Sequence, residues 1–142
     1  MARLDEAPTI AELWLRSRRA AKGIPPAAHS DDEVRAWFCE VVIPTRELWI
    51  TELRGELTGL MVLDGEQLEQ LYVAPEFLRQ GHGSRLVRLA QQTRSALALW
   101  TFEANLSARA FYEAHGFRAQ GPPSIDNEER TAAIQYKWTR SV

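Results

Sequence analysis

One short segment combines glycines with a cation in the pattern of a phosphate-binding turn: Arg79, Gln80, Gly81, His82, Gly83 and Ser84. Glycines let a backbone turn tightly and approach a ligand closely. Free N–H groups at the start of a following helix, together with the helix dipole, would face an anion such as pyrophosphate. The same glycine spacing also occurs in tight connections that bind nothing, so the segment alone leaves both interpretations open.

The residues after the turn exclude two familiar nucleotide sites. No Gly-Lys-Ser/Thr sequence follows, as a nucleoside-triphosphate P-loop requires. Leu86 stands where a dinucleotide-binding fingerprint needs its third glycine. If the turn binds a pyrophosphate, the ligand therefore belongs to another class.

Hydrophobic periodicity places this turn between a strand and a helix. Strands are predicted at 48–53, 57–63 and 66–73, and Asp64–Gly65 is a strong signal for a two-residue hairpin. A helix with one apolar face follows the turn. This order puts the glycines at a helix N-terminus, where an anion site is expected.

Two helices are predicted before the strands. The first separates an apolar face from charges at Glu12, Arg16, Arg18 and Arg19. The second begins at Ser30, whose spacing to Glu33 is that of a capping box, and it is expected to end at Pro44.

The C-terminal part continues with a strand at 97–102, a helix at 105–115 and strands at 117–119 and 131–138. Gly121-Pro122-Pro123 is expected to break the first of these last two strands. The run from 68 to 102 is long enough for a right-handed parallel crossover. The order as a whole predicts an α/β or α+β fold with a mixed sheet.

Composition limits the functional classes. The 142 residues suit one domain, spanning 1–142, and the net charge of −2 argues against non-specific nucleic-acid binding. Without a leader or an apolar run of membrane-spanning length, the protein is expected in the cytoplasm and away from membranes. Cys39 is expected to be a small buried hydrophobe. No metal is assigned, because the three histidines lack ligand spacing.

Two blocks of sequence resemble the GNAT acetyltransferases. The first is Leu71-Tyr72-Val73-Ala74-Pro75 followed by Gln80-Gly81-His82-Gly83, which looks like the central motif of that family. The second is Asn105-Leu106-Ser107-Ala108-Arg109-Ala110-Phe111-Tyr112, followed by Gly116-Phe117. Both occur in the family's order, and the resemblance covers essentially the whole chain. It implies a GNAT-type mixed, mostly antiparallel central sheet with about four flanking helices.

The resemblance also implies acetyl-CoA as co-substrate and assigns its contacts. The pantetheine arm would lie between the strand at 71–73 and the strand at 97–102 and bond to the backbone of Leu71 and Val73 as another strand would, with Tyr72 also at the cofactor. The N–H groups of 79–84 would hold the pyrophosphate. The second block would supply the remaining contacts, from Asn105, Ser107, Ala108, Phe111 and Tyr112.

The chain departs from the family pattern at two places. The family usually has Gln or Arg three residues before the first motif glycine, and this chain has Leu78. Backbone contacts to phosphate survive that change, while a side-chain contribution passes to Arg79. The family's first strand would also be reduced to residues 1–4.

Acetyl transfer from a thioester to an amine needs a proton donor for the sulfur and an acceptor for the amine proton. By its family position Tyr112 is the predicted acid, with a hydroxyl of pKa about 10. Glu69, two residues before Leu71, and Glu103, two residues before Asn105, are alternative bases. The predicted mechanism is direct attack in a ternary complex, without an acyl-enzyme.

The acceptor amine is not specified by sequence. A small-molecule amine is the first expectation; a protein N-terminus or lysine, and an inactive CoA-binding module, are the alternatives. The loops 23–29 and 121–130 are expected to decide between a closed pocket and an open groove. Trp37, Trp49 and Trp100 are candidates for the pocket or for the core. The last strand, as an edge, would suit a homodimer.

Overall fold

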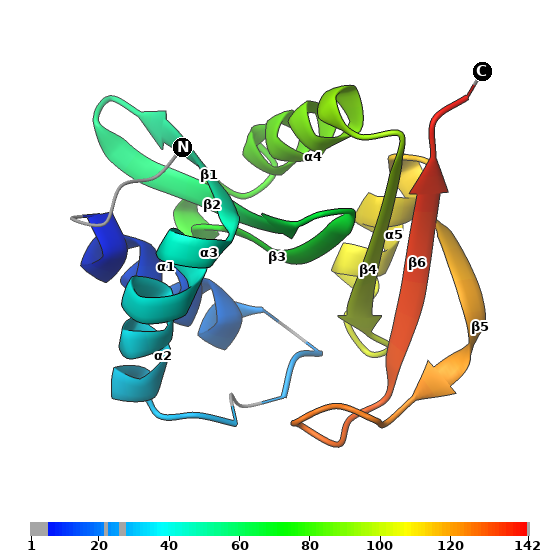
Figure 1. The fold of residues 1–142 in the computed structure, drawn as a ribbon, viewed down its shortest axis with the longest axis horizontal. Coiled ribbons are helices and arrows are strands. Elements are labelled where there is room, and N and C mark those ends of the chain that lie inside the picture. The colour runs from blue at the N-terminus through cyan, green and yellow to red at the C-terminus, as the bar shows by residue number, and fades with distance from the viewer. Residues whose placement is uncertain (1–5, 22, 26–27, 142) are drawn as a thin grey trace.

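The computed structural model describes residues 6–21, 23–25 and 28–141. Residues 1–4, predicted as a reduced first strand, lie outside the described part. Four helical segments come first and a meander of three strands follows. Helices and strands then alternate up to the last two strands (Figure 1). The helices are α1 Ala7–Ala20, α2 Asp31–Trp37, the π-helix η2 Phe38–Val42, α3 Ile43–Thr45, the 3-10 turn η3 Pro75–Phe77, α4 His82–Thr93 and α5 Leu106–Ala114. The strands are β1 Glu47–Leu53, β2 Glu56–Asp64, β3 Gln67–Val73, β4 Ala96–Phe102, β5 Arg118–Ser124 and β6 Ala133–Thr139.

The described strands form one mixed sheet in the order β1-β2-β3-β4-β6-β5. Four of the five neighbouring pairs are antiparallel, and β3 and β4 are parallel. This arrangement confirms the predicted mixed sheet and parallel crossover.

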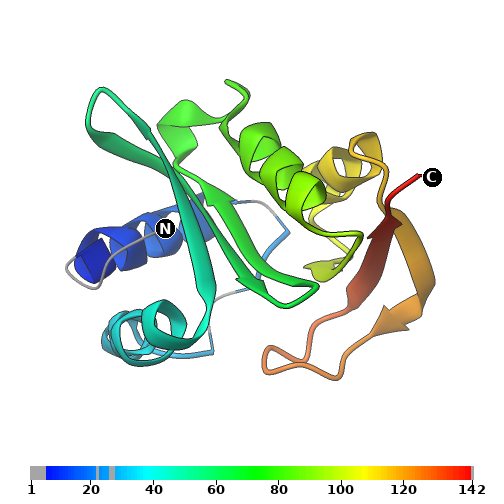
Figure 2. The same ribbon diagram turned by 45° about the horizontal axis from the view of Figure 1, so that its top comes forward.

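The internal strand β2 has an apolar core on each of its two faces. Leu60 and Val62 belong to a core with α1 and α2, whereas Met61 and Leu63 belong to a second core with α4. Successive side chains of a strand point to opposite faces. The continuous apolar run in β2 is therefore explained by helices on both sides of the sheet, as Figure 2 also shows.

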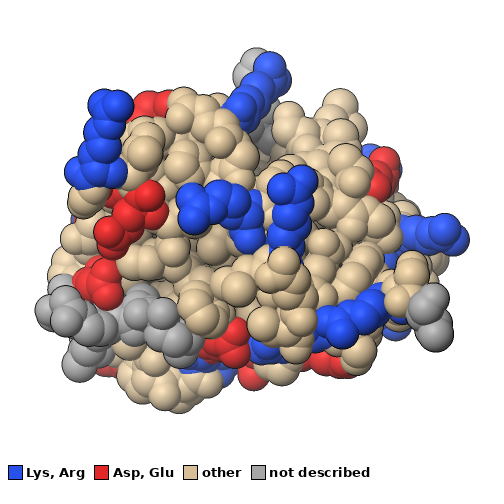
Figure 3. All heavy atoms as spheres, turned by 90° about the horizontal axis from the view of Figure 1, so that it is seen from above, with Lys and Arg blue, Asp and Glu red and all other residues tan. Residues whose placement is uncertain are grey.

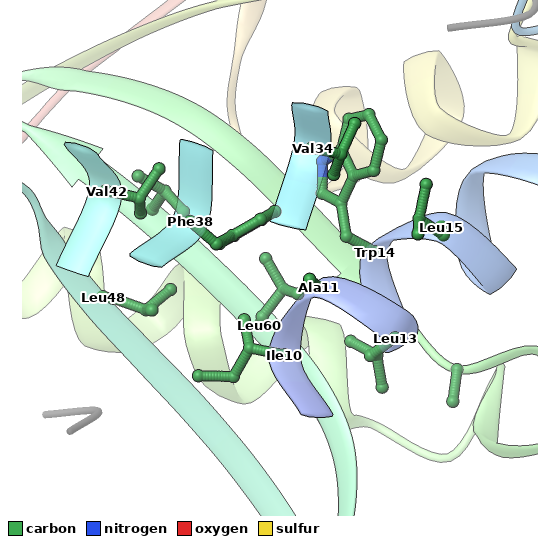
Figure 4. Close-up of a cluster of buried hydrophobic side chains, with 12 residues drawn as sticks. Ile10, Ala11, Leu13, Trp14, Leu15, Val34, Phe38, Val42, Leu48 and Leu60 are labelled. Atoms are coloured by element: carbon green, nitrogen blue, oxygen red, sulfur yellow. The ribbon is translucent and has the colours of Figure 1, made fainter. Parts of the chain in front are cut away.

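The first core fixes α1 and α2 against the meander. Figure 4 shows Trp14 of α1 and Phe38 of η2 in this cluster, together with Leu48 and Leu60 from the strands. Phe38 and Leu60 are fully buried, and the rings of Trp14 and Phe38 meet edge to face at 6.2 Å. This packing holds the C-terminal half of α1 beside β3.

Three expectations about the chain path are corrected. The second helix does not end at Pro44: after the π-helix η2 it continues as α3, and Pro44 lies in the first turn of α3, where no N–H donor is needed. β5 runs through Gly121-Pro122-Pro123, because an edge strand tolerates proline and its register shifts between Gln120 and Ser124. β6 is an internal strand, so β5, and not the last strand, forms that edge.

Cys39 is also not buried. It lies exposed on η2, although apolar residues surround it in sequence. Its neighbour Phe38 takes the inward position of that helix.

Candidate active site

The parallel strands β3 and β4 pair at one position and then diverge. Gln67 faces Ala98, and the N–H of Ala98 donates to the carbonyl of Glu66 at 2.9 Å. Beyond this bridge a cleft of about 470 Å³ lies between the two strands, with Leu71 and Tyr72 on one wall and Thr101 and Phe102 on the other. The predicted opening between these strands is therefore present.

The glycine turn forms the N-terminus of α4, next to Val73 of β3 and Phe111 of α5, and none of its residues lines the cleft itself. Gly81 is the N-cap residue with φ of +89°, and Arg79 also has a positive φ of +63°. A Cβ on Gly83 would lie 3.3 Å from the Phe111 ring and 3.5 Å from a Val73 methyl carbon. Glycine at this position lets the helix start lie close to both the strand and α5.

Positive charge surrounds the same helix end. Arg79 and Gln80 are exposed in the turn, and Arg85 and Arg88 follow in α4. Figure 3, which looks down on the molecule from above, shows Lys and Arg side chains on this face. Free N–H groups, the positive helix end and arginines together are the features that favour an anion at a helix N-terminus.

The side chain of His82, inside the glycine turn, is buried. Its side chain is 7% exposed, its Nδ1 lies 3.2 Å from the Thr58 hydroxyl, and its ring meets Phe77 edge to face. His82 therefore anchors the turn to β2 with its side chain, which leaves only its backbone for a phosphate.

Ser84 and His115 connect α4 to the end of α5. His115 Nδ1 lies 2.8 Å from the carbonyl of Phe111, which only accepts, so Nδ1 carries the proton. In the neutral ring Nε2 then accepts from the Ser84 hydroxyl at 3.1 Å. The His115 ring also packs on Phe111. This contact fixes the spacing between the two helices that flank the anion site.

Most of the predicted contacts on α5 converge on the cleft. Asn105, Ala108 and Tyr112 line it, while Ser107 is exposed and outside the lining. Asn105 Oδ1 caps α5 by accepting from the Ala108 N–H at 3.2 Å. The cap occupies Oδ1 and leaves the Nδ2 amino group available to a ligand carbonyl.

Tyr112 contributes a buried hydroxyl to the cleft. Its side chain is 7% exposed, and no described residue hydrogen-bonds its hydroxyl. Burial raises the pKa of Tyr112 well above its ordinary value, and the nearby Tyr72 raises it further. Burial also raises the pKa of Tyr72, against the opposing effect of Arg18. Tyr112 therefore remains a neutral hydrogen-bond donor at physiological pH.

The two predicted bases occupy different surroundings. Glu69 lines the cleft at a bulge in β3, where Val62 pairs with Gln70 but Leu63 pairs with Leu68. Its Oε1 accepts from Arg46 Nε at 2.9 Å, and this contact raises the pKa of Arg46. Glu103 is exposed and does not line the cleft.

We call the turn 79–84, together with α4 and α5, the cofactor side of the cleft, and we call the opposite side the acceptor side. The acceptor side is built around a buried ion pair. Arg18 of α1 bonds Glu129 at 3.1 Å, and their side chains are 9% and 16% exposed. The guanidinium also lies over the rings of Trp14 at 5.2 Å and Phe102 at 5.7 Å. Arg18 thereby connects α1, β4 and the loop before β6 at the cleft wall.

Sequence reasoning missed Arg18 by placing it among the exposed charges. The signal that could have found it is the spacing of Ile10, Trp14 and Arg18, which lie four residues apart on one line of the helix. Of the three candidate tryptophans, Trp100 lines the cleft and is 53% exposed. Trp37 instead packs against Phe38 in the first core.

Further contacts fasten the loop after α1 across the acceptor side. Gly23 has φ of +79°, and a Cβ there would lie 2.1 Å from the carbonyl oxygen of Ala104. His29 Nε2 lies 2.9 Å from the Glu128 carboxylate. The two loops that were expected to shape the acceptor site therefore contact each other and the end of β4.

Comparisons with known proteins agree with this geometry. A family model described as an acetyltransferase (GNAT) domain matches residues 44–119. The chain is 31% identical over 117 residues to the peptidyl-lysine N-acetyltransferase YiaC of Escherichia coli strain K12. The matched region covers 82% of this chain and 80% of YiaC.

Solved structures share the fold. The solution structure of apo YjaB from Escherichia coli has a TM-score of 0.77 at 23% identity, covering 99% of this chain and 95% of that one. The structure of yncA, a putative acetyltransferase from Salmonella typhimurium with acetyl-CoA, has a TM-score of 0.70 at 16% identity, covering 99% and 92%. The resemblance inferred from the two motifs is thereby confirmed. Among the described helices, none is long and apolar enough to cross a membrane.

Proposed function

Because this chain belongs to the GNAT family of acetyltransferases, we propose that it transfers the acetyl group of acetyl-CoA to the ε-amino group of lysine side chains in polypeptides. The observation that carries this proposal is a cleft with a different chemical character at each side. Tyr112 and Asn105 lie on the cofactor side, and Asp126 and Glu129 lie on the acceptor side.

A lysine side chain suits the acceptor side by shape and by charge. Its unbranched alkyl chain matches a cleft with aromatic walls at Tyr72, Trp100 and Phe102. Its ammonium group matches the carboxylate of Asp126. A relative with 31% identity, YiaC, is named a peptidyl-lysine N-acetyltransferase. That name supports the same acceptor for this chain.

The proposed reaction is direct attack within a ternary complex. An alkyl ammonium of pKa about 10.4 loses a proton, through water, to Glu69. The amine nitrogen forms a bond to the thioester carbon, a backbone N–H of β3 stabilises the oxygen charge, and the carbon–sulfur bond breaks. Tyr112 donates a hydrogen bond to the departing sulfur. The nitrogen loses its second proton as the amide forms, and the sulfur takes up one proton and leaves as the CoA thiol. Cys39 does not line the cleft, so no acyl-enzyme is expected.

A small-molecule amine is the second candidate acceptor. It is favoured by the contacts of Arg18 with Glu129 and of His29 with Glu128, which join α1 and the loop after it to the loop before β6. Such a bridge narrows the entrance, and a free amine needs no groove for flanking residues.

A panel of acceptors separates the two candidates. Purified protein with acetyl-CoA is assayed against lysine-containing peptides, peptides whose lone amine is the N-terminus, butylamine and spermidine. We expect the highest kcat/KM with internal lysine, and mass spectrometry should find the acetyl group on the side chain and none on Cys39. Turnover of the free amines with no peptide acetylation would reject the lysine proposal. Calorimetric titration with acetyl-CoA, with ATP in parallel, controls for an active cofactor side.

A further inference from the structure

One half of the central sheet has a face that no described helix covers. In β4, Leu97 and Leu99 point into the second core with α4 and α5, so Ala96, Ala98 and Trp100 point the other way. In Figure 1 this face of β4, β6 and β5 is turned toward the viewer, and α1 and α2 stand beside it over the other half of the sheet.

The pairing register defines what this open face carries. Trp100 lies opposite Gln135, and Ala98 lies opposite Lys137. Lys137 in turn lies opposite Arg118 of the edge strand β5. The open face therefore carries an exposed tryptophan, then glutamines, and then two cationic side chains.

The two cations indicate a missing anionic partner. Arg118 and Lys137 are both exposed, and neither forms an ion pair within the described residues. Like charges directly opposite each other on neighbouring strands destabilise a sheet. Folding alone gives no reason for this pair, whereas an acidic ligand would convert the repulsion into attraction.

The open face is continuous with the acceptor side of the cleft. Trp100 and Phe102, on the same face, line the cleft. Ser124 at the end of β5 and Ala133 at the start of β6 line it as well. Lys137 lies two residues along and one strand across from Trp100, about 8 Å away. An extended peptide covers that distance in about two to three residues.

We propose that the open face of β4, β6 and β5 is the docking surface for the polypeptide that carries the acceptor lysine, and that it selects lysines with an acidic residue a few positions away. This inference rests on the proposed lysine acetyltransferase function. The exposed carboxylate of Asp126 receives the lysine ammonium, Trp100 contacts the adjoining backbone and side chain, and Arg118 with Lys137 binds the acidic residue.

Charge reversal on both partners tests the surface. Three peptides share one internal lysine and carry Glu, Ser or Arg at the second and third positions on each side of it. Wild-type protein should prefer the acidic over the basic peptide by about tenfold in kcat/KM, mainly through KM, and the preference should shrink with added salt. The double variant Arg118→Glu with Lys137→Glu should reverse the preference. It keeps two like charges opposite each other, so its stability should stay close to wild type.

Two controls make the result specific. Arg54→Glu changes an exposed arginine in the turn between β1 and β2, at the opposite edge of the sheet, and should leave the peptide preference unchanged. Butylamine, which has no flanking residues, should be acetylated equally by the double variant and by wild type. Acetyl-CoA binding by calorimetry confirms that each variant is folded.

Failure of the lysine proposal can be distinguished from failure of the docking surface. If wild-type protein acetylates butylamine but none of the peptides, the lysine proposal fails and the docking surface with it. If the peptides are acetylated and flanking charge makes no difference, or the double variant keeps the wild-type preference, the docking surface alone is rejected. Sedimentation that finds a dimer dissociated by the double variant would also reject it, because a second copy would then occupy the face.

Discussion

The two sides of the cleft are held together in different ways. On the cofactor side the backbone has the main role: Gly81 takes a positive φ at the helix start, and Gly83 lets α4 approach Phe111. On the acceptor side the contacts are between side chains distant in sequence, above all Arg18 and Glu129. Backbone geometry of this kind suits a constant ligand, whereas side-chain pairs are easily exchanged when an acceptor changes.

Breaking the buried ion pair is expected to have the largest effect. Arg18→Met leaves Glu129 without its partner in a largely buried position, which should lower the free energy of unfolding by about 3 kcal/mol. Urea unfolding measures the loss. Arg16→Met is the matched control on the same helix, because Arg16 and Glu76 pair with 50% and 45% exposure. That variant should lose well under about 1 kcal/mol. Equal losses in both variants would contradict the special role of the buried pair.

Tyr112→Phe should have the largest effect on the cofactor side. Removing the hydroxyl removes the hydrogen bond to the departing sulfur, so kcat should fall about 10²-fold, while calorimetric CoA affinity should stay within about twofold. Because the pKa of Tyr112 is raised, ionisation of this residue should not lower the wild-type rate below about pH 10. An unchanged kcat would remove Tyr112 from the mechanism.

The cofactor side of the cleft could be predicted because it depends on local backbone patterns in the sequence. The strand expected at 48–53 is observed as Glu47–Leu53, and the one at 97–102 as Ala96–Phe102. Alternating side chains and the glycines at 81 and 83 act over a few residues, so their consequences are visible in sequence. The same information identified the family.

The acceptor side of the cleft depended on contacts between residues that are distant in sequence, and no local sequence pattern predicts such contacts. Arg18 and Glu129 are separated by 111 positions, and no local pattern links them. The bulge that turns Glu69 into the cleft wall comes from pairing with β2, and the continuation of β5 through Pro122 and Pro123 comes from its place at the sheet edge. Tertiary pairing determined each of these features.

The two predicted bases provide the next comparison, between a residue inside the cleft and one outside it. Glu69→Gln should lower kcat/KM by at least about tenfold at neutral pH and flatten its acid limb, because the group that accepts the amine proton is lost. Glu103→Gln, at an exposed turn, should remain near wild type. The measurement is a pH profile of kcat/KM with a lysine peptide. A larger loss in Glu103→Gln would assign the base to the end of β4.

Gly83→Ala tests whether close approach matters on the cofactor side. The added Cβ would lie 3.3 Å from the Phe111 ring, so the ring must shift and acetyl-CoA affinity should fall by roughly tenfold. Gly81→Ala is the matched comparison, because a Cβ there meets nothing within 4 Å and only the positive φ is strained. That variant should lose about 1 kcal/mol of stability with a smaller change in affinity. Calorimetry and unfolding separate the two effects.

The smallest expected effect is the pH dependence of the loop contact on the acceptor side. The carboxylates of Glu128 and Glu33 raise the pKa of His29 above its ordinary value of 6.5. A raised pKa stabilises the folded state fully below pH 6.5, and that contribution disappears as pH rises through the raised value. His29→Ala should therefore lower Tm by about 1 °C at about pH 5 and leave it unchanged at about pH 9.

Acceptor KM and acetyl-CoA affinity show whether this contact acts on one side of the cleft only. In wild-type protein the acceptor KM should respond to loss of the His29 charge, and the variant should remove that response. Acetyl-CoA affinity should differ little between the two proteins across this range, because the His29 contact lies away from the turn 79–84. A variant that changed acetyl-CoA affinity as much as acceptor KM would mean that the two sides are coupled through the loop after α1. Gly23, packed against Ala104 next to Asn105, would then be the point of coupling.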